Sequence, residues 1–415
     1  MFFVYRILTN LVLILSPVII FIRLLKKKEH PTRFKEKLGF YKKKRLDGKL
    51  IWFHGASVGE ILSIIPLIEK LENNSEIAQI LITSNTLSSS KILSNLKFKK
   101  TIHQFFPIDT NYHSKRFLNY WKPSVAFFID SEIWPNMIVN IKRKPIALLL
   151  INARITDKSF KKWQIFKSTA KTLFQQFDIC LSSSLKSKKY LKALGAKKIK
   201  YIGNLKFTES EKNISTFSSE LKKFFSSKRI WCASSTHNIE EKICADVHKK
   251  LKTKYKNLLT IIIPRHIHRA KKIINEMKKL NLKTYVHESR KKINKQTDIY
   301  LVNSFGQTKS FFKICKTVFL GGSMIRHGGQ NPLEAARLGC KILHGPNVWN
   351  FDEIYSLLEK YKVSNKVLNS DQLALTVDKM LNNKNKYKNL EFKIKKLGNK
   401  ILNSTLNEIN FYINK

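Results

Sequence analysis

The sequence predicts an α/β protein of two doubly wound parallel sheets that face a cleft, with an apolar helix at the N-terminus. After residue 48, short apolar runs of strand length alternate with longer helical patterns, the order that gives parallel sheets with helices on both faces. A polar segment at residues 207–228, rich in Ser, Lys and Glu, divides this alternation into two series. The 415 residues provide enough chain for two domains, each with its own core.

The N-terminal residues 1–25 are the most apolar part of the chain. From Ile7 to Ile22 there are 16 residues without a charge, which as a helix would span about 24 Å against a hydrocarbon core of about 30 Å. The lysines that follow directly and the lack of a small-residue cleavage site argue against a secretory signal, whereas a buried core helix remains an alternative. We predict a membrane anchor, either a marginal single span or an embedded helix, with the following basic residues against anionic lipid on the cytoplasmic side.

The first predicted domain comprises residues 26–206. Its expected strands are seven apolar runs: Leu50–His54, Gln79–Thr83, His103–Pro107, Val125–Asp130, Ile146–Ile151, Ile179–Ser182 and Ile199–Gly203. Helical patterns lie between these runs, for example Val58–Glu72.

The second predicted domain comprises residues 229–395, and a helical tail follows at 396–415. Its expected strands are Ile230–Ala233, Leu258–Ile263, Thr284–His287, Ile299–Asn303, Val318–Gly322 and Lys341–His344. Ligands of doubly wound sheets bind at the carboxyl ends of the strands. The residues that follow each strand are therefore the candidates for a functional site.

The net charge of +49 favours anionic partners, which include nucleic acid, anionic lipid and phosphorylated small molecules. Of the 78 basic residues 65 are Lys and 13 are Arg. Arg supplies the planar fork that recognises bases and phosphates, whereas Lys is a point charge. Together with abundant Asn and Ile, the lysine excess indicates drift of an A/T-rich coding sequence as the main cause of the positive charge, with a functional excess on top.

The first candidate motif is the segment His54–Glu60, which joins a predicted strand to a predicted helix. Its small residues let a ligand approach the backbone, and the helix N-terminus attracts anions. Glu60 would face the cleft and accept a proton. The alternative is structural: Ser57 and Glu60 have the spacing of a capping box, and His54 is then a strand-end histidine satisfied in the core.

Two carboxylates, Asp130 and Glu132, follow another apolar strand. In that position they suit contacts with a cation or with sugar hydroxyls. The alternative is a helix start, with acidic residues against the helix dipole and Pro135 in the first turn. Asn152–Arg154 also follows a strand, and the motif GNLKF carries Lys206 to the point where the two domains join.

In the second half, Pro264-Arg265-His266 follows a strongly apolar strand, where the Arg either holds a phosphate or is a solvated turn residue. Four of the 14 glycines of the chain lie within the nine residues 321–329, before a helix that begins near Pro332. This loop would offer bare backbone N–H groups and a helix N-terminus to a phosphate. Glu334, in the first helical turn, would bind ribose hydroxyls.

In this order the motifs resemble those of the bacterial 3-deoxy-D-manno-octulosonic acid (Kdo) transferases of lipid A assembly. The resemblance covers nearly the whole chain. It implies a GT-B glycosyltransferase with two Rossmann-like domains and the donor on the C-terminal one. Such an enzyme transfers Kdo from CMP-Kdo to the lipid A precursor (lipid IVA) with inversion, at the cytoplasmic face of the bacterial inner membrane.

The resemblance also implies roles for individual residues. Glu60 matches the general base, while Asp130, where the family usually has Glu, and Lys206 match two positions that stabilise the transition state. The positions that align with the CMP-binding residues are Pro264, Arg265, Phe305, Gly306, Gln307, Asn331, Pro332, Leu333 and Glu334. Phe305 and Gln307 replace a usual Met and Glu, so in that stretch only the backbone of Gly306 carries over. Two further positions differ from the family pattern, since Ile239 replaces a usual Gly and Gln330 a usual His.

No cofactor is implied. The chain has no Asp-x-Asp and no Cys-x-x-Cys motif, so we expect metal-independent transfer without metal-binding residues. The expected partners are CMP-Kdo, the lipid A precursor and an anionic membrane surface, and nucleic acid is not an expected partner. Two alternatives are a GT-B transferase that uses another nucleotide sugar and, from a different class, a polybasic membrane or nucleic-acid binding protein with salt-sensitive affinity for any polyanion.

Overall fold

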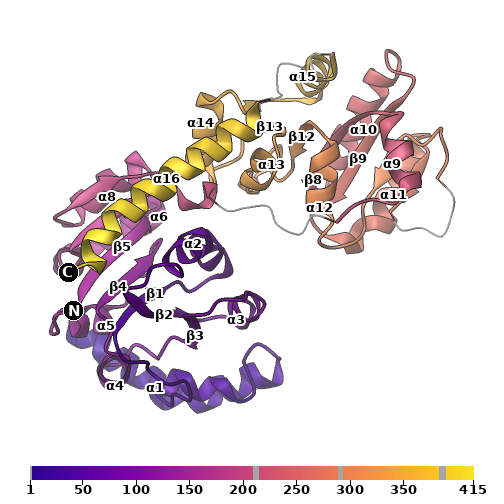
Figure 1. The fold of residues 1–415 in the computed structure, drawn as a ribbon. Helices are drawn as coiled ribbons and strands as arrows, with labels where there is room; N and C mark the ends of the chain where they lie inside the picture. Colours follow the sequence, from indigo (N-terminus) through magenta and orange to yellow (C-terminus); the bar gives the residue numbers. More distant parts are fainter. Residues whose placement is uncertain (1, 209–214, 288–292, 383–388) are drawn as a thin grey trace. The chain divides into compact units, whose positions relative to one another are not determined.

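The computed structural model of the chain describes residues 2–208, 215–287, 293–382 and 389–415. It divides into two compact units, Met1–Glu209 with Gly398–Lys415, and Ser210–Leu397. Each unit contains one seven-stranded sheet flanked by helices (Figure 1). All strand pairs recorded in these two sheets are parallel, which confirms the fold class predicted from the alternation of strand and helix patterns.

The sheet of the first unit has the strand order β3-β2-β1-β4-β5-β6-β7. These strands are β1 (Lys49–His54), β2 (Ile77–Ser84), β3 (Thr101–Phe105), β4 (Val125–Ile129), β5 (Ala147–Ala153), β6 (Ile179–Ser182) and β7 (Ile199–Tyr201). The helices are α1 (Phe2–Leu25), η1 (Arg33–Leu38), α2 (Val58–Leu71), α3 (Leu87–Ser94), α4 (Asn111–Trp121), α5 (Pro135–Ile141), α6 (Asp157–Ile165), α7 (Lys167–Phe174), α8 (Leu185–Ala193) and η2 (Leu205–Phe207). All seven predicted strands are present, with ends that differ by up to two residues.

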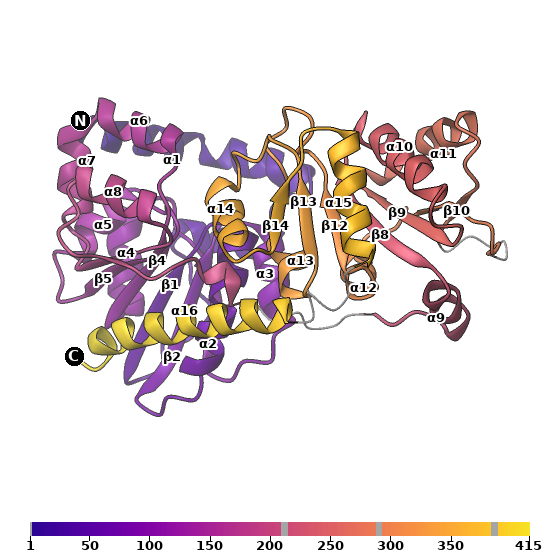
Figure 2. The same ribbon diagram turned by 90° about the horizontal axis from the view of Figure 1, so that it is seen from above.

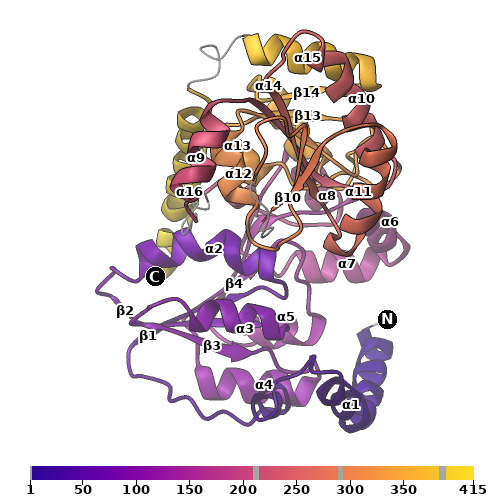
Figure 3. The same ribbon diagram turned by 90° about the vertical axis from the view of Figure 1, so that its right-hand side faces the viewer.

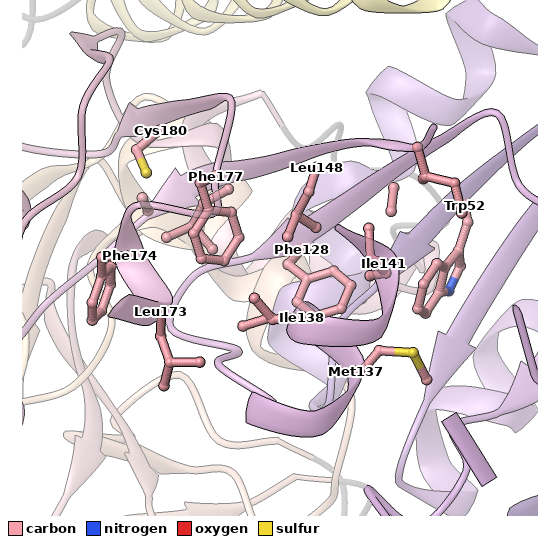
Figure 4. Close-up of a cluster of buried hydrophobic side chains, with 14 of the residues drawn as sticks. Trp52, Phe128, Met137, Ile138, Ile141, Leu148, Leu173, Phe174, Phe177 and Cys180 are labelled. Carbon is pink, nitrogen blue, oxygen red and sulfur yellow. The ribbon is translucent and has the colours of Figure 1, made fainter. Parts of the chain in front are cut away.

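The strands of this sheet are apolar throughout because both faces are covered by helices. Along β1, Leu50 and Trp52 point to one face and belong to a buried cluster that α4, α5 and α7 complete (Figure 4). Ile51 and Phe53, on the opposite face, are equally buried. Since side chains alternate along a strand, this burial on both sides explains why the predicted strands are continuous apolar runs.

Helix α1 confirms the predicted N-terminal apolar helix and is the one described helix long and apolar enough to cross a membrane. Only a narrow stripe of it docks on the first unit, where Tyr5 Oη donates to Asp109 Oδ2 (2.8 Å), and Ser16 and Ile20 are buried. Figure 3 shows α1 beside the region that carries α4. The other faces of α1 expose thirteen large apolar side chains to the surroundings.

The sheet of the second unit has the order β10-β11-β9-β8-β12-β13-β14. Its strands are β8 (Arg229–Thr236), β9 (Leu258–Pro264), β10 (Thr284–Val286), β11 (Ile299–Leu301), β12 (Thr317–Leu320), β13 (Lys341–His344) and β14 (Ser364–Lys366). The helices are α9 (Ser219–Ser226), α10 (Glu240–Lys252), η3 (Ile267–Arg269), α11 (Ala270–Lys279), α12 (Thr308–Ile314), α13 (Leu333–Arg337), α14 (Asp352–Lys360) and α15 (Ser370–Asn382). The six predicted strands are present, whereas β14 was not predicted because this edge strand, Ser-Asn-Lys, carries no apolar run.

The C-terminal helix α16 (Leu390–Ile413) is one long helix in the chain (Figure 2). Its part from Gly398 onward belongs to the first unit, where Ile401 lies against Gly203 and Lys200 pairs with Glu408 (2.7 Å). The polar segment at 207–228 carries the short helix α9, and residues 209–214 of it lie outside the described residues.

Candidate active site

The candidate residues of the first unit lie where the strand order of its sheet reverses. Successive strands are added on one side from β1 to β3 and on the other from β4 to β7, so the reversal lies between β1 and β4. In doubly wound sheets ligands bind outside the carboxyl ends of the two strands at this point. His54 ends β1 and Asp130 follows β4 directly, so both motifs singled out in the sequence reach the same place.

Glu60 lies in the first turn of α2 and forms the capping box that its spacing predicts. Ser57 Oγ accepts from the Glu60 backbone N–H (3.3 Å), and Glu60 Oε2 accepts from the N–H groups of Ala56 (2.7 Å) and Ser57 (3.4 Å). Glu60 Oε1 accepts from the Ser57 hydroxyl (2.7 Å). A carboxylate has about four acceptor positions, so the cap occupies three and leaves one on Oε1.

The electrostatic surroundings of Glu60 favour its protonated form. Burial, followed by the nearby carboxylates of Glu132 and Asp130, raises the pKa of Glu60 from 4.5 to about 7, against the lowering effect of the hydrogen bonds from Ser57 and Ala56. A carboxylate with a pKa near neutrality is suited to take up and release a proton. The capping role and a role as general base therefore coexist in the same side chain.

Asp130 and Lys206 are brought together by Asn152. Lys206 Nζ lies 3.3 Å from Asp130 Oδ2, Asn152 Nδ2 donates to Asp130 Oδ1, and Asn152 Oδ1 accepts from the Leu205 N–H (2.8 Å). Asp130 and Asn152 both have positive φ, 54° and 51°, a left-handed conformation that Asp and Asn adopt more readily than most residues. Helix α2 packs against η2, which carries Lys206 to the helix that bears Glu60.

The alternative interpretation, a helix start with an acidic first turn, is confirmed for Pro135, the first residue of α5, and is wrong for Asp130 and Glu132, which precede that helix. Helix α5 begins at Pro135 and has no acidic residue in its first turn. Glu132 instead accepts from Trp134 Nε1 (2.8 Å) and lies 3.4 Å from His54 Nε2. Burial alone would raise the pKa of Glu132, but the nearby His54 ring and the hydrogen bond from Trp134 hold it below its usual value.

In the second unit the glycine loop after β12 is organised by a buried carboxylate. Glu240 Oε2 accepts from Gly322 N–H (2.7 Å) and His237 N–H (3.0 Å), and its Oε1 from the N–H groups of Ser323 (3.1 Å) and Met324 (3.0 Å). The expectation that these N–H groups are bare and bind a phosphate is therefore wrong for this part of the loop. Glycine is required at 321 because a Cβ there would lie 2.5 Å from the Ser235 carbonyl oxygen.

The residues that match CMP-binding positions all lie at the carboxyl edge of this sheet. Pro264 ends β9 and is buried, while Arg265 is exposed. Gln307 precedes α12 and accepts from Ser215 Oγ (3.0 Å), Phe305 is 76% exposed, and Gly306 has a φ of 81°. Lys309 of α12 lies 3.9 Å from Glu334 of α13, which links the second and third of these segments.

The third segment starts α13 as predicted. Asn331 Oδ1 accepts from the Leu333 N–H (3.1 Å), Pro332 is the N-cap residue, and Leu333 is buried. Glu334 is partly exposed in the first turn. Among the described residues there is no group of three or more His, Cys, Asp or Glu side chains that could hold a metal ion.

Two residues that support the site were not among the sequence-predicted site residues. Asn152 positions Asp130, and Glu240 positions the glycine loop. Asn152 belonged to a segment singled out after a strand, and Glu240 follows Ile239, which differs from the family pattern, but spacing alone did not show which groups the two side chains would bind. The signal that could have found Asn152 is its type, since a polar residue that tolerates positive φ ends an otherwise apolar strand.

Two doubly wound α/β units with polar residues at both switch points define the GT-B fold class. A putative UDP-N-acetylglucosamine 2-epimerase from Listeria monocytogenes has this fold, with a TM-score of 0.60 at 13% identity over 88% of this chain and 97% of that one. A family model for 3-deoxy-D-manno-octulosonic-acid transferase (kdotransferase) matches residues 32–209.

Two relatives match this chain over more than nine-tenths of its length. The chain is 33% identical to the 3-deoxy-D-manno-octulosonic acid transferase of Rickettsia bellii over 93% of both chains. It is 30% identical to that of Haemophilus influenzae, over 91% of this chain and 90% of the relative. The chain belongs to the 3-deoxy-D-manno-octulosonic acid transferase family, whose members are glycosyltransferases.

Proposed function

We propose that this chain transfers Kdo from CMP-Kdo to the lipid A precursor in lipopolysaccharide core biosynthesis, with inversion at the anomeric carbon. The observation that carries the proposal is the group at the carboxyl edge of the first sheet. There a carboxylate with a pKa of about 7, Glu60, lies near the Asp130–Lys206 ion pair. The chain belongs to a family named for this transfer.

In the proposed step Glu60 is the general base. Its free acceptor position takes the proton of the acceptor hydroxyl while the hydroxyl oxygen bonds to the anomeric carbon of Kdo. The bond from that carbon to the CMP phosphate oxygen breaks at the same time, and CMP leaves with the electron pair. Because attack and departure occur on opposite faces, the configuration inverts.

Positively charged side chains would offset the negative charge that develops on the CMP phosphate during the reaction. Lys206, held by Asp130, provides a fixed cation on η2, which packs against the helix that carries the general base. Fixed charges in place before the reaction stabilise a developing charge most effectively. On the second unit, Arg265 and the segment Asn331–Glu334 would hold CMP. No step of this scheme uses a metal ion.

We further propose that the enzyme acts at the cytoplasmic face of the inner membrane, with α1 embedded along the bilayer surface. Tyr5 and Arg6 contact Asp109, which follows β3, and Asn136, which opens α5 after β4. The docked stripe of α1 therefore lies near the sheet edge that carries Glu60. Its thirteen exposed apolar side chains provide a face for the lipid.

The decisive assay incubates the full chain in detergent with generated CMP-Kdo and lipid A precursor, and reads product masses. We expect mass increments of one or more Kdo residues. Protection against thermal unfolding by CMP but not by UDP supports the donor assignment. Transfer from a UDP sugar, or protection by UDP alone, would refute it.

The membrane arrangement has a separate test. An embedded α1 keeps the N-terminus on the cytoplasmic side, so an N-terminal tag should resist protease added to spheroplasts, and the chain should stay with membranes in carbonate. A tag cleaved from the periplasmic side would instead show a span. Release into the soluble fraction without detergent would contradict both arrangements.

A further inference from the structure

Three histidine rings gather at the switch point of the second sheet. His237 follows β8, His266 follows β9, and His327 belongs to the loop after β12. The ring centroid of His237 lies 4.2 Å from that of His327 and 5.8 Å from that of His266. The strand order of this sheet reverses between β8 and β12, so the three rings lie where doubly wound sheets bind their ligands.

Backbone covers the cluster on one side, and solvent reaches it on the other. A Cβ on Gly322 would lie 3.3 Å from His327 and Gln330 and 3.4 Å from His237, so the bare backbone of this glycine forms the floor. His237 is 8% exposed and its Nε2 lies 3.4 Å from Gln330 Nε2, whereas His266 and His327 are exposed. A ligand can therefore reach the rings from the solvent side.

The groups around His237 are predominantly positive. Burial lowers the pKa of His237 to about 4, and His327, His266, Arg269 and Arg265 add to this effect. The two carboxylates beside the cluster are already engaged. Glu240 accepts backbone N–H groups, and Glu241 is bound by Arg269 through two hydrogen bonds of 2.7 and 3.1 Å.

Burial and the positive neighbours keep His237 without a proton until an anion arrives. A phosphate placed among the rings would offset this repulsion, and His237 as an imidazolium would then donate a charge-assisted hydrogen bond. Binding of the anion and uptake of protons are thus linked, and the affinity for the anion rises as the pH falls.

We infer that His237, His266 and His327, together with Arg265, bind the phosphate of the nucleotide donor. The inference rests on the proposed function, since it assigns the rings to the leaving group of CMP-Kdo. Two segments that match CMP-binding positions border the rings. Arg265 directly precedes His266, and Gln330, which lies beside His237, directly precedes Asn331. The histidines thereby neutralise the phosphate charge that builds up as CMP departs.

The test compares the affinities of CMP and of cytidine for the full chain in detergent, by calorimetry at pH 6, 7 and 8. The ratio of the two affinities isolates the phosphate. We expect His237→Asn and His327→Asn each to lower this ratio about 10-fold at pH 6, the size of one charged hydrogen bond, and to leave cytidine binding unchanged. The wild-type ratio should decline toward pH 8 more steeply than that of either variant.

His30→Asn is the matched control, because this histidine belongs to the first unit and not to the sheet that carries the cluster. It should keep the wild-type ratio. His327 is exposed, so His327→Asn gives an answer even if His237→Asn fails to fold. An unchanged ratio in His327→Asn would overturn the inference.

The design keeps this inference separate from the proposed donor. If UMP bound the wild type as tightly as CMP, the donor assignment would be wrong. The ratio of UMP to uridine would then test the histidine cluster in the same way. A wild-type ratio near one would show that the cluster does not hold a phosphate at all.

Discussion

Glu60→Gln separates the two roles that the structure gives to one side chain. Glutamine at the third helical position still closes a capping box, so α2 keeps its N-terminal cap. The amide, however, takes no proton from an acceptor hydroxyl at neutral pH. We expect kcat for transfer to fall about 10²- to 10⁴-fold, the usual contribution of a general base, while the protein stays folded.

The same variant has a predictable effect on stability. The pKa of Glu60 rises from 4.5 to about 7 in the folded state, so the folded state disfavours the carboxylate. Each difference of one in pKa corresponds to about 1.4 kcal/mol, which gives an upper bound of about 3.4 kcal/mol. This penalty is absent below pH 4.5, grows as the pH rises, and is complete above pH 7.

Glu60→Gln should therefore stabilise the first unit at pH 8 by up to about 3 kcal/mol and leave its stability at pH 4.5 nearly unchanged. Denaturant unfolding followed by tryptophan fluorescence measures this, because four of the six tryptophans (Trp52, Trp121, Trp134 and Trp163) belong to the first unit. The wild-type rate of transfer should rise with pH through about 7, as Glu60 loses its proton.

The control is Glu69→Gln, the same substitution farther along α2, which should change neither the rate nor its pH profile. Transfer near the wild-type rate by Glu60→Gln would refute the base assignment and leave Glu60 as a cap alone. A variant that is less stable at pH 8 than the wild type would refute the burial argument for the raised pKa.

Four further predictions concern the remaining parts of the molecule. Asp130→Asn keeps a residue that tolerates a φ of 54° but removes the partner of Lys206, so kcat should drop about 10- to 100-fold at a nearly unchanged unfolding midpoint; full activity would contradict a role for the pair. Glu240→Gln leaves at least one buried N–H unpaired, at a cost of about 1–3 kcal/mol, and should weaken CMP binding, as calorimetry would show; tight binding would mean that the loop is held otherwise. Ile239→Gly relieves a β-branched residue at a φ of 81° and should stabilise the second unit by about 1 kcal/mol in denaturant unfolding; destabilisation would show that the Ile side chain matters more than the backbone. Activity should persist in EDTA, and a loss that a divalent ion restores would refute metal-independent transfer.

The sequence predicted the fold well because its strands are buried on both faces. Continuous apolar runs such as the one that forms β4 are visible without any tertiary information. The strand that escaped prediction, β14, contains only Ser364, Asn365 and Lys366, and is a strand solely because its backbone pairs with β13. A strand that forms only through backbone hydrogen bonds has no characteristic side-chain pattern in the sequence.

In the site, too, the sequence predicts where polar residues stand but not which groups they contact. The positions of Glu60, Asp130 and Lys206 after strands were visible in the sequence, and the contact between Asp130 and Lys206 agrees with their joint assignment. That Asn152 would hold Asp130 depends on two left-handed residues at adjacent strand ends. Such a contact joins residues far apart in the chain, and spacing carries no information about it.

By itself the sequence determined the class of this protein: two parallel α/β units, an apolar N-terminal helix, and polar motifs at the carboxyl ends of strands. Periodicity and turn chemistry are local properties, so they survive in the linear order of residues. The tertiary structure alone decided how each polar group is used. It gave the N–H groups of the glycine loop to Glu240, gave Glu60 both a cap and a pKa near 7, and gathered three histidines at one switch point. Hydrogen bonds and charge interactions depend on distances in space, and those distances are set by the packing of strands and helices that the chain itself keeps far apart.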